Sequence, residues 1–227
     1  LINQSFLTAR RPLKAFYKMI KNKFELAFQR CPLVGILRGI RPTEAIDVTE
    51  TLVSVGFKII EVPLNSPEAL KSIEKIVSKF GDSCVIGAGT VVSEKQVADL
   101  HNAGAALVVS PHADPELVEK TLEYDMYPIP GIATPTEAFR MIKSGATTLK
   151  IFPSELIKPK QLSSLVQVLP KNIRILPVGG INHENISDYL KAGAHGFGLG
   201  ASLYQPGLEI STVRKNAVTL IKALRLD

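Results

Sequence analysis

Short apolar runs alternate with longer amphipathic stretches over most of the chain. From residue 32 onward, eight runs rich in Val, Ile and Leu have the length of buried strands, and each is followed by a stretch in which apolar residues recur every three or four positions. The runs predict strands at 34–37, 58–62, 84–88, 106–109, 127–129, 148–151, 173–178 and 195–199. The amphipathic stretches predict helices at 43–55, 67–79, 93–103, 115–124, 136–144, 160–168, 184–191 and 210–224.

The predicted helices carry typical start and stop signals. At three helix starts a capping side chain stands before a proline or an acid: Ser66-Pro67, Ser93-Glu94 and Asp114-Pro115. Glycine adopts the left-handed backbone conformation of a helix end easily, and it follows four of the helices, at Gly56, Gly104, Gly145 and Gly193. These signals place the unit boundaries independently of the apolar pattern.

Eight strand-then-helix units of about 20 to 25 residues are typical of a closed parallel (β/α)8 barrel, the TIM barrel. An open doubly wound sheet is the alternative, but that fold would place a glycine-rich fingerprint after the first strand. This chain has R-G-I-R-P at residues 38–42 instead. We therefore predict an α/β protein with a single (β/α)8 barrel domain at residues 31–227.

Residues 1–30 precede the barrel and have a pattern of their own. Apolar residues recur there at helical spacing with lysines between them, which predicts an amphipathic helix; they are Leu13, Phe16, Tyr17, Ile20, Phe24 and Phe28. The apolar stripe of such a helix needs a surface to cover, and we expect it to close the bottom of the barrel. A basic segment that touches a membrane surface, or an organelle-targeting sequence, is the alternative.

The formal net charge of +6 lies in this extension. Residues 1–30 contain seven Lys or Arg and one Glu, and residues 31–227 contain 20 basic and 20 acidic residues. This balance argues against a basic nucleic-acid face on the folded domain. The chain has no apolar run long enough to span a bilayer and no secretory signal, and its two cysteines, Cys31 and Cys84, fit a reducing compartment. We expect a cytoplasmic protein with no nucleic-acid or membrane partner.

Two ionisable residues lie inside predicted strands, where a charge is costly to bury. Lys150 is in T-T-L-K-I-F-P-S, and Glu61 is in I-I-E-V-P. The carboxyl ends of barrel strands line the active site, so we expect both side chains to point into the barrel or its mouth. Lys150 either reaches solvent or a partner or is held neutral for chemistry, and Glu61 is either an ion-pair partner or a proton carrier with a raised pKa. A buried ion pair contributes little stability, which favours the catalytic interpretation.

Two glycine-bearing turns follow the last two predicted strands, P-V-G-G-I and F-G-L-G-A-S. Barrels often bind phosphate at these two loops, because bare glycines let backbone N–H groups approach the anion. The turns make Gly179, Gly180, Gly200 and Ser202 candidates for a phosphate site. The predicted substrate is a small phosphorylated molecule.

Other candidates follow earlier strands. Arg38 could bind a carboxylate with both guanidinium nitrogens, and Thr90, in G-A-G-T, offers its hydroxyl to the same anion, although Thr90 could equally cap the next helix. His112, in S-P-H-A-D-P, is a lone loop histidine of the kind that is usually solvated. No carboxylate–histidine cluster suggests a divalent metal, so we predict no metal site.

The motifs G-I-L-R-G-I, E-V-P-L-N-S-P, I-G-A-G-T-V, L-K-I-F-P-S and P-V-G-G-I together resemble the class I aldolases that act on 2-keto-3-deoxy-6-phospho sugar acids. The resemblance implies that Lys150 forms a Schiff base with the keto carbon, that Glu61 moves protons and that the two late glycine loops hold phosphate. It also implies a homotrimer, release of pyruvate and glyceraldehyde 3-phosphate, and no organic cofactor or metal. Phe152 is expected to pack against the substrate's apolar face.

One motif distinguishes branches of that family. Phosphogluconate-type enzymes usually read E-V-T-L-R-T where this chain has E-V-P-L-N-S, so their carboxylate-binding arginine is matched by Asn65. The E-x-P-L-N-S-P form resembles the phosphogalactonate branch, in which the arginine matching Arg38 binds the carboxylate. The phosphogalactonate is thus the expected substrate, with the phosphogluconate and 4-hydroxy-2-oxoglutarate as further candidates. Two alternatives remain: a sugar-phosphate epimerase or isomerase, and a non-catalytic sugar-phosphate sensor that reaches a partner through its basic helix.

Overall fold

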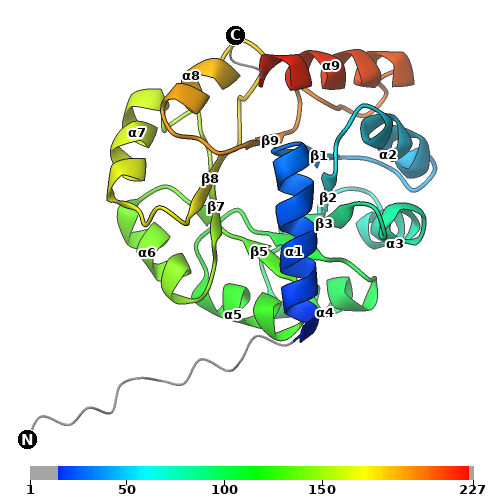
Figure 1. The fold of residues 1–227 in the computed structure, drawn as a ribbon. Helices are drawn as coiled ribbons and strands as arrows, with labels where there is room; N and C mark the ends of the chain where they lie inside the picture. Colours follow the sequence, from blue (N-terminus) through cyan, green and yellow to red (C-terminus); the bar gives the residue numbers. More distant parts are fainter. Residues whose placement is uncertain (1–14, 225–227) are drawn as a thin grey trace, which may run out of the picture.

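The computed structural model describes residues 15–224, in which parallel strands lie inside a surround of helices (Figure 1). The strands are β1 Leu33–Ile36, β2 Ile59–Pro63, β3 Val85–Gly89, β4 Leu107–Val109, β5 Tyr127–Ile129, β6 Gly131–Ile132, β7 Thr148–Ile151, β8 Arg174–Pro177 and β9 Phe197–Leu199. The helices are α1 Ala15–Arg30, α2 Ala45–Ser54, α3 Ala69–Phe80, α4 Glu94–Asn102, α5 Pro115–Glu123, α6 Pro135–Lys143, α7 Pro159–Val168, α8 Ile186–Lys191 and α9 Ile210–Ala223.

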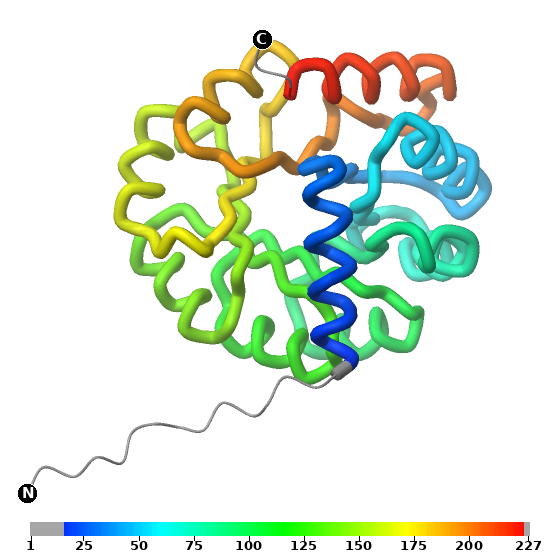
Figure 2. Tube along the Cα trace, viewed as in Figure 1, coloured from blue at the N-terminus to red at the C-terminus, as the bar shows by residue number. Residues whose placement is uncertain are grey.

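The strands form two sheets. One contains six strands in the order β5-β4-β3-β2-β1-β9, the other three in the order β6-β7-β8, and neighbours in both are parallel. The chain winds around this centre, so that α9 packs beside α2 although the two are far apart in sequence (Figure 2). The predicted parallel α/β architecture, in which strands alternate with helices, is confirmed. Within residues 15–224 no helix combines the length and the apolarity needed to cross a bilayer.

The boundary between the two sheets lies at Pro130. The predicted strand at 127–129 continues to residue 132, but it is divided into β5 and β6 at this position, because proline has no N–H to donate. The Pro130 carbonyl still accepts a hydrogen bond from the Lys150 N–H at 2.9 Å. At the other edge, an isolated parallel bridge joins Val178 to Gly198, and His195 N–H donates to the Ile175 carbonyl at 3.0 Å.

Helix α1 crosses the amino ends of the strands (Figure 1). Its buried residues Ile20, Phe24 and Phe28 share an apolar cluster with the first residues of several strands, and the Phe24 ring stacks on Tyr127 with centroids 3.9 Å apart. Phe16 does not follow the predicted apolar stripe, since 52% of it is exposed. The predicted stripe residue Leu13 lies outside the described residues.

Most of the predicted helix boundaries are confirmed. Ser93 and Asp114 cap α4 and α5 through their side chains. The four glycines predicted to end helices all have positive φ, namely Gly56, Gly104, Gly145 and Gly193. Ser66 is a correction, because α3 begins after Glu68 and the Ser66 hydroxyl instead accepts from the Gly39 N–H at 2.9 Å. The turn after β2 is thereby tied to the turn after β1.

Candidate active site

Lys150 and Glu61 face one small cavity at the centre of the strands. Lys150 is in β7 and Glu61 is in β2, and their exposed fractions are 5% and 2%. The rest of the lining is apolar; it consists of Val34, Ile36, Val109, Ile129, Leu176, Val178 and Gly198. Two ionisable groups that the sequence places on separate strands therefore share one buried, apolar environment.

Burial shifts the pKa values of both groups toward their neutral forms. It lowers the pKa of Lys150, although the Glu61 carboxylate acts in the opposite direction. It raises the pKa of Glu61 to about 7, against the effect of Lys150 and of Arg38. Burial thus makes the neutral amine of Lys150 more accessible than that of an exposed lysine, beside a carboxyl that can accept or donate a proton near neutral pH.

Polar atoms of both side chains are available for contacts beyond those within the protein. Glu61 Oε2 is buried and has no hydrogen-bond partner among residues 15–224. Lys150 Nζ lies 4.4 Å from the centroid of the Phe152 ring, so the predicted site residue Phe152 contacts the amine from the end of β7. A carboxylate oxygen that lacks a partner in a dry cavity is costly, and a ligand that bonds to it removes this cost.

Gly89 is a site residue that the sequence analysis missed. It pairs with Pro63 across β2 and β3, and a Cβ atom at this position would overlap the Glu61 carboxylate. The carboxylate therefore fits only because residue 89 has no side chain. The signal in the sequence was the second glycine of G-A-G-T, which was used only to locate Thr90.

Arg38, Asn65 and Thr90 are brought together at the rim. Arg38 Nη1 donates to Asn65 Oδ1 at 2.7 Å, and Nη2 lies 3.4 Å from Thr90 Oγ1. Arg38 acts on the pKa of both Lys150 and Glu61, so its charge lies within electrostatic reach of the cavity. The three rim residues thus place a cation and two polar side chains beside the two buried groups.

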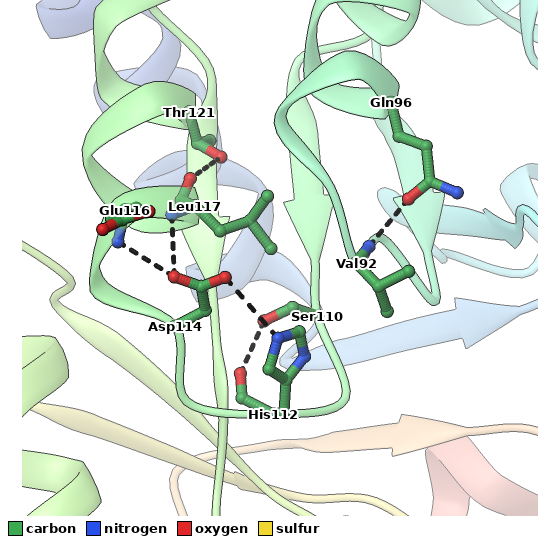
Figure 3. Close-up of polar contacts among 8 residues, drawn as sticks. All are labelled: Val92, Gln96, Ser110, His112, Asp114, Glu116, Leu117 and Thr121. Carbon is green, nitrogen blue, oxygen red and sulfur yellow. Dashed lines mark hydrogen bonds and ion pairs between the residues drawn. The ribbon is translucent and has the colours of Figure 1, made fainter.

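The alternative role of Thr90 as a helix cap is not what the structure shows. Ser93 caps α4, and the Val92 N–H donates to Gln96 Oε1 at 2.7 Å (Figure 3). Thr90 itself has a φ of 58°, which is uncommon for a residue other than glycine. Strained backbone of this kind is often found at functional sites.

His112 lies in the loop that leads into α5 (Figure 3). Its Nε2 is 3.6 Å from Asp114 Oδ2, and 45% of its side chain is exposed. The Asp114 carboxylate also accepts from the backbone N–H groups of Glu116 and Leu117, so its place is fixed by the helix start. Among residues 15–224, no group of three or more His, Cys, Asp or Glu side chains is arranged to hold a metal ion.

The two glycine-bearing turns begin directly beyond the cavity wall, because Val178 and Gly198 line the cavity. Gly179 and Gly180 both have positive φ, 102° and 62°. Their carbonyls accept from the Ser154 hydroxyl and from Asn185 Nδ2, which fixes the peptide orientations.

The second turn is open. A Cβ atom built on Gly200 would meet nothing within 4 Å, and the buried Ser202 hydroxyl has no partner among the described residues. Glu155, which the sequence analysis did not single out, extends over the first turn. Nothing in the sequence marked Glu155 as a site residue, because an acidic residue in a loop is usually exposed to solvent and has no specific role.

Comparisons with known proteins agree with this geometry. Residues 24–224 match the model of the KDPG and KHG aldolase family. The chain is 41% identical over 196 residues to the 2-dehydro-3-deoxy-6-phosphogalactonate aldolase of Escherichia coli K12, covering 86% of this chain and 96% of that protein.

Two solved structures extend the comparison. A structure described as native KDPGal is 41% identical, with a TM-score of 0.84 over 86% of this chain and 94% of that one. A Legionella pneumophila KDPG aldolase, described with pyruvate captured as a covalent carbinolamine intermediate, is 26% identical, with a TM-score of 0.77 over 86% of this chain and 96% of that one. This chain belongs to the KDPG and KHG aldolase family.

Proposed function

We propose that the protein is a class I aldolase that cleaves a 2-dehydro-3-deoxy-6-phospho sugar acid into pyruvate and glyceraldehyde 3-phosphate. The observation that carries the proposal is the pair in the cavity: a buried lysine with a lowered pKa beside a buried glutamate with a raised one. The phosphogalactonate is the preferred substrate, in line with the name of the relative that is 41% identical. The phosphogluconate and 4-hydroxy-2-oxoglutarate are the further candidates.

The first step is attack by the neutral Lys150 amine on the C2 carbonyl carbon. Proton transfer gives a carbinolamine, and loss of its hydroxyl as water gives an iminium ion. Glu61 is placed to donate and accept these protons, because its pKa of about 7 makes both of its forms accessible. The covalent carbinolamine named in the description of the Legionella relative supports this step.

The second step breaks the C3–C4 bond. Glu61, directly or through one water, removes the proton of the C4 hydroxyl, and the C4 oxygen forms the aldehyde of glyceraldehyde 3-phosphate. The electron pair of the broken bond moves to the iminium nitrogen, which leaves an enamine on Lys150. Protonation at C3 and addition of water then release pyruvate and the free amine.

Binding residues surround the pair. Arg38 and Thr90 hold the carboxylate of the pyruvate part, with Asn65 keeping the guanidinium in place. Gly179, Gly180, Gly200 and Ser202 hold the phosphate, and Phe152 packs against the apolar face of the substrate. The distant phosphate contributes binding energy that orients the reacting carbons over Lys150.

The proposal also includes the closure of the barrel, the bounds of the domain and the oligomeric state. We infer that β5 and β6 act as one strand and that the Val178–Gly198 bridge joins the two sheets, which together make a closed (β/α)8 barrel. Residues 31–227 form the aldolase domain, and α1 from the extension 1–30 closes its amino end. A cytoplasmic homotrimer is the expected working form.

Trapping with pyruvate and borohydride tests the proposal. Reduction should attach pyruvate to Lys150, as located by peptide mass spectrometry, and Lys150→Arg should remain unmodified. Pyruvate release from both 6-phospho epimers, compared by kcat/KM, then identifies the preferred substrate. Absence of the adduct in the wild-type protein contradicts the proposal and favours a sugar-phosphate epimerase or isomerase, which needs no imine.

A further inference from the structure

The side chain of Glu155 covers the two-glycine turn after β8. A Cβ atom at Gly179 would overlap the Glu155 carboxylate, and one at Gly180 would lie 2.9 Å from Glu155 Cγ. The acid reaches this position from the loop after β7, the strand that carries Lys150. A carboxylate therefore rests on the backbone to which the proposed function assigns the substrate's phosphate.

This carboxylate is not tied down. Glu155 is exposed, and within residues 15–224 its side chain takes part in no hydrogen bond or ion pair. Burial raises the pKa of Tyr189, whose hydroxyl donates to the Ser154 carbonyl at 2.9 Å, and the Glu155 charge acts in the same direction as burial. Within residues 15–224, no ion pair balances this negative charge.

A phosphate and a carboxylate cannot share this turn. Both are anions, and the overlap with a Cβ at Gly179 shows that the carboxylate fills the space in front of that residue. A phosphate that approaches the backbone of the turn must displace the Glu155 side chain and then remain beside a like charge, which weakens its binding.

We propose that Glu155 competes with the substrate's phosphate for the Gly179–Gly180 turn and so sets the enzyme's preference for phosphorylated over unphosphorylated substrates. This inference rests on the proposed function for the identity of the substrate. Glu155 is a specificity-determining residue and not a catalytic one, because it lies over the turn and does not line the cavity of Lys150 and Glu61. The wild-type enzyme therefore prefers phosphorylated substrates less strongly than it would if no carboxylate covered the Gly179–Gly180 turn.

The direct test is the binding of inorganic phosphate by isothermal titration calorimetry, with the full chain at low ionic strength. Glu155→Gln keeps the shape and removes the charge, and we expect it to lower the Kd by about fivefold, as for a screened like-charge contact at a partly exposed site. The difference should shrink in high salt. Glu184→Gln is the matched control: it removes an exposed acid four residues after Gly180 in the sequence, and it should leave the Kd unchanged.

A kinetic test uses the same variants. The ratio of kcat/KM for 2-keto-3-deoxy-6-phosphogalactonate to that for its unphosphorylated counterpart should rise about fivefold in Glu155→Gln and stay at the wild-type value in Glu184→Gln. An unchanged or weaker phosphate affinity in Glu155→Gln overturns the inference, as does the absence of phosphate binding in both proteins. Failure of the proposed aldolase function looks different, because pyruvate release and the borohydride adduct are then missing while Glu155→Gln still binds phosphate more tightly.

Discussion

Replacement of Glu61 by glutamine should stabilise the protein much more at alkaline pH than at acidic pH. Complete burial raises the pKa of Glu61 from 4.5 to about 7 in the folded protein. Because the folded-state pKa lies above the unfolded-state value, the group favours folding below pH 4.5 and loses that contribution as the pH rises to 7. Above pH 7 the folded protein carries the full penalty of an ionised carboxylate in the cavity.

The size of the effect follows from the shift. A rise from 4.5 to about 7 corresponds to about 3 kcal/mol at 1.36 kcal/mol per pH unit. Glutamine keeps the shape of the side chain but does not ionise. Glu61→Gln should therefore gain about 3 kcal/mol relative to wild type at pH 8 but only about 1 kcal/mol at pH 5. The difference of about 2 kcal/mol between these two gains is the quantity to test, because any pH-independent effect of the amide cancels in it.

Urea denaturation followed by circular dichroism measures this difference, with all proteins at one concentration so that any subunit association affects them under the same conditions. The control is Glu184→Gln, whose side chain is exposed, and it should show the same pH dependence as wild type. Equal free-energy differences between Glu61→Gln and wild type at pH 5 and pH 8 would refute the reasoning. Pyruvate release should be lost in Glu61→Gln at both pH values, since the amide cannot transfer the proton.

Three further predictions follow from individual contacts. Gly89→Ala should lower Tm and abolish pyruvate release, because its Cβ overlaps the Glu61 carboxylate, whereas Gly200→Ala should keep the wild-type Tm. Arg38→Ala should raise the pyruvate concentration needed for half-maximal borohydride trapping by roughly 10-fold to 100-fold, as expected for a lost charged hydrogen bond. Arg174→Met should lower the free energy of urea unfolding by about 1–2 kcal/mol, because it leaves the partly buried Glu25 unpaired.

The strands and helices could be predicted from the sequence because each has a clear period and clear ends. The inward positions of Lys150 and Glu61 were also predicted, because both residues lie in short strands of a barrel whose strand ends line the interior or its mouth. The division at Pro130 was not predicted. The apolar pattern predicted a strand only at 127–129, and the structure adds β6 beyond Pro130, whose missing N–H separates the two strands.

Contacts between strands and loops that are distant in the sequence could not be predicted from it. The need for glycine at position 89 depends on the pairing of β2 with β3, which local pattern does not reveal. Ser66 has the spacing of a helix cap, yet its hydroxyl bonds to the Gly39 N–H because the two turns lie side by side. The sequence shows Glu155 only as an acidic residue in a loop, and its contact with the turn after β8 is visible only in the structure.

The amino end of the strand assembly is an apolar core, the other end carries the ionisable site residues, and the cavity lies between them. At the amino end, α1 fills the interior with apolar contacts, and Val34, Val109, Ile129 and Leu176 belong both to that apolar cluster and to the cavity lining. The floor beneath Lys150 and Glu61 is thus the top of the core that α1 packs. These apolar side chains are part of the surroundings that bury both ionisable groups, and burial is the largest cause of their pKa shifts. We therefore expect a change that loosens α1 to lower the activity of the proposed site as well as the stability of the fold.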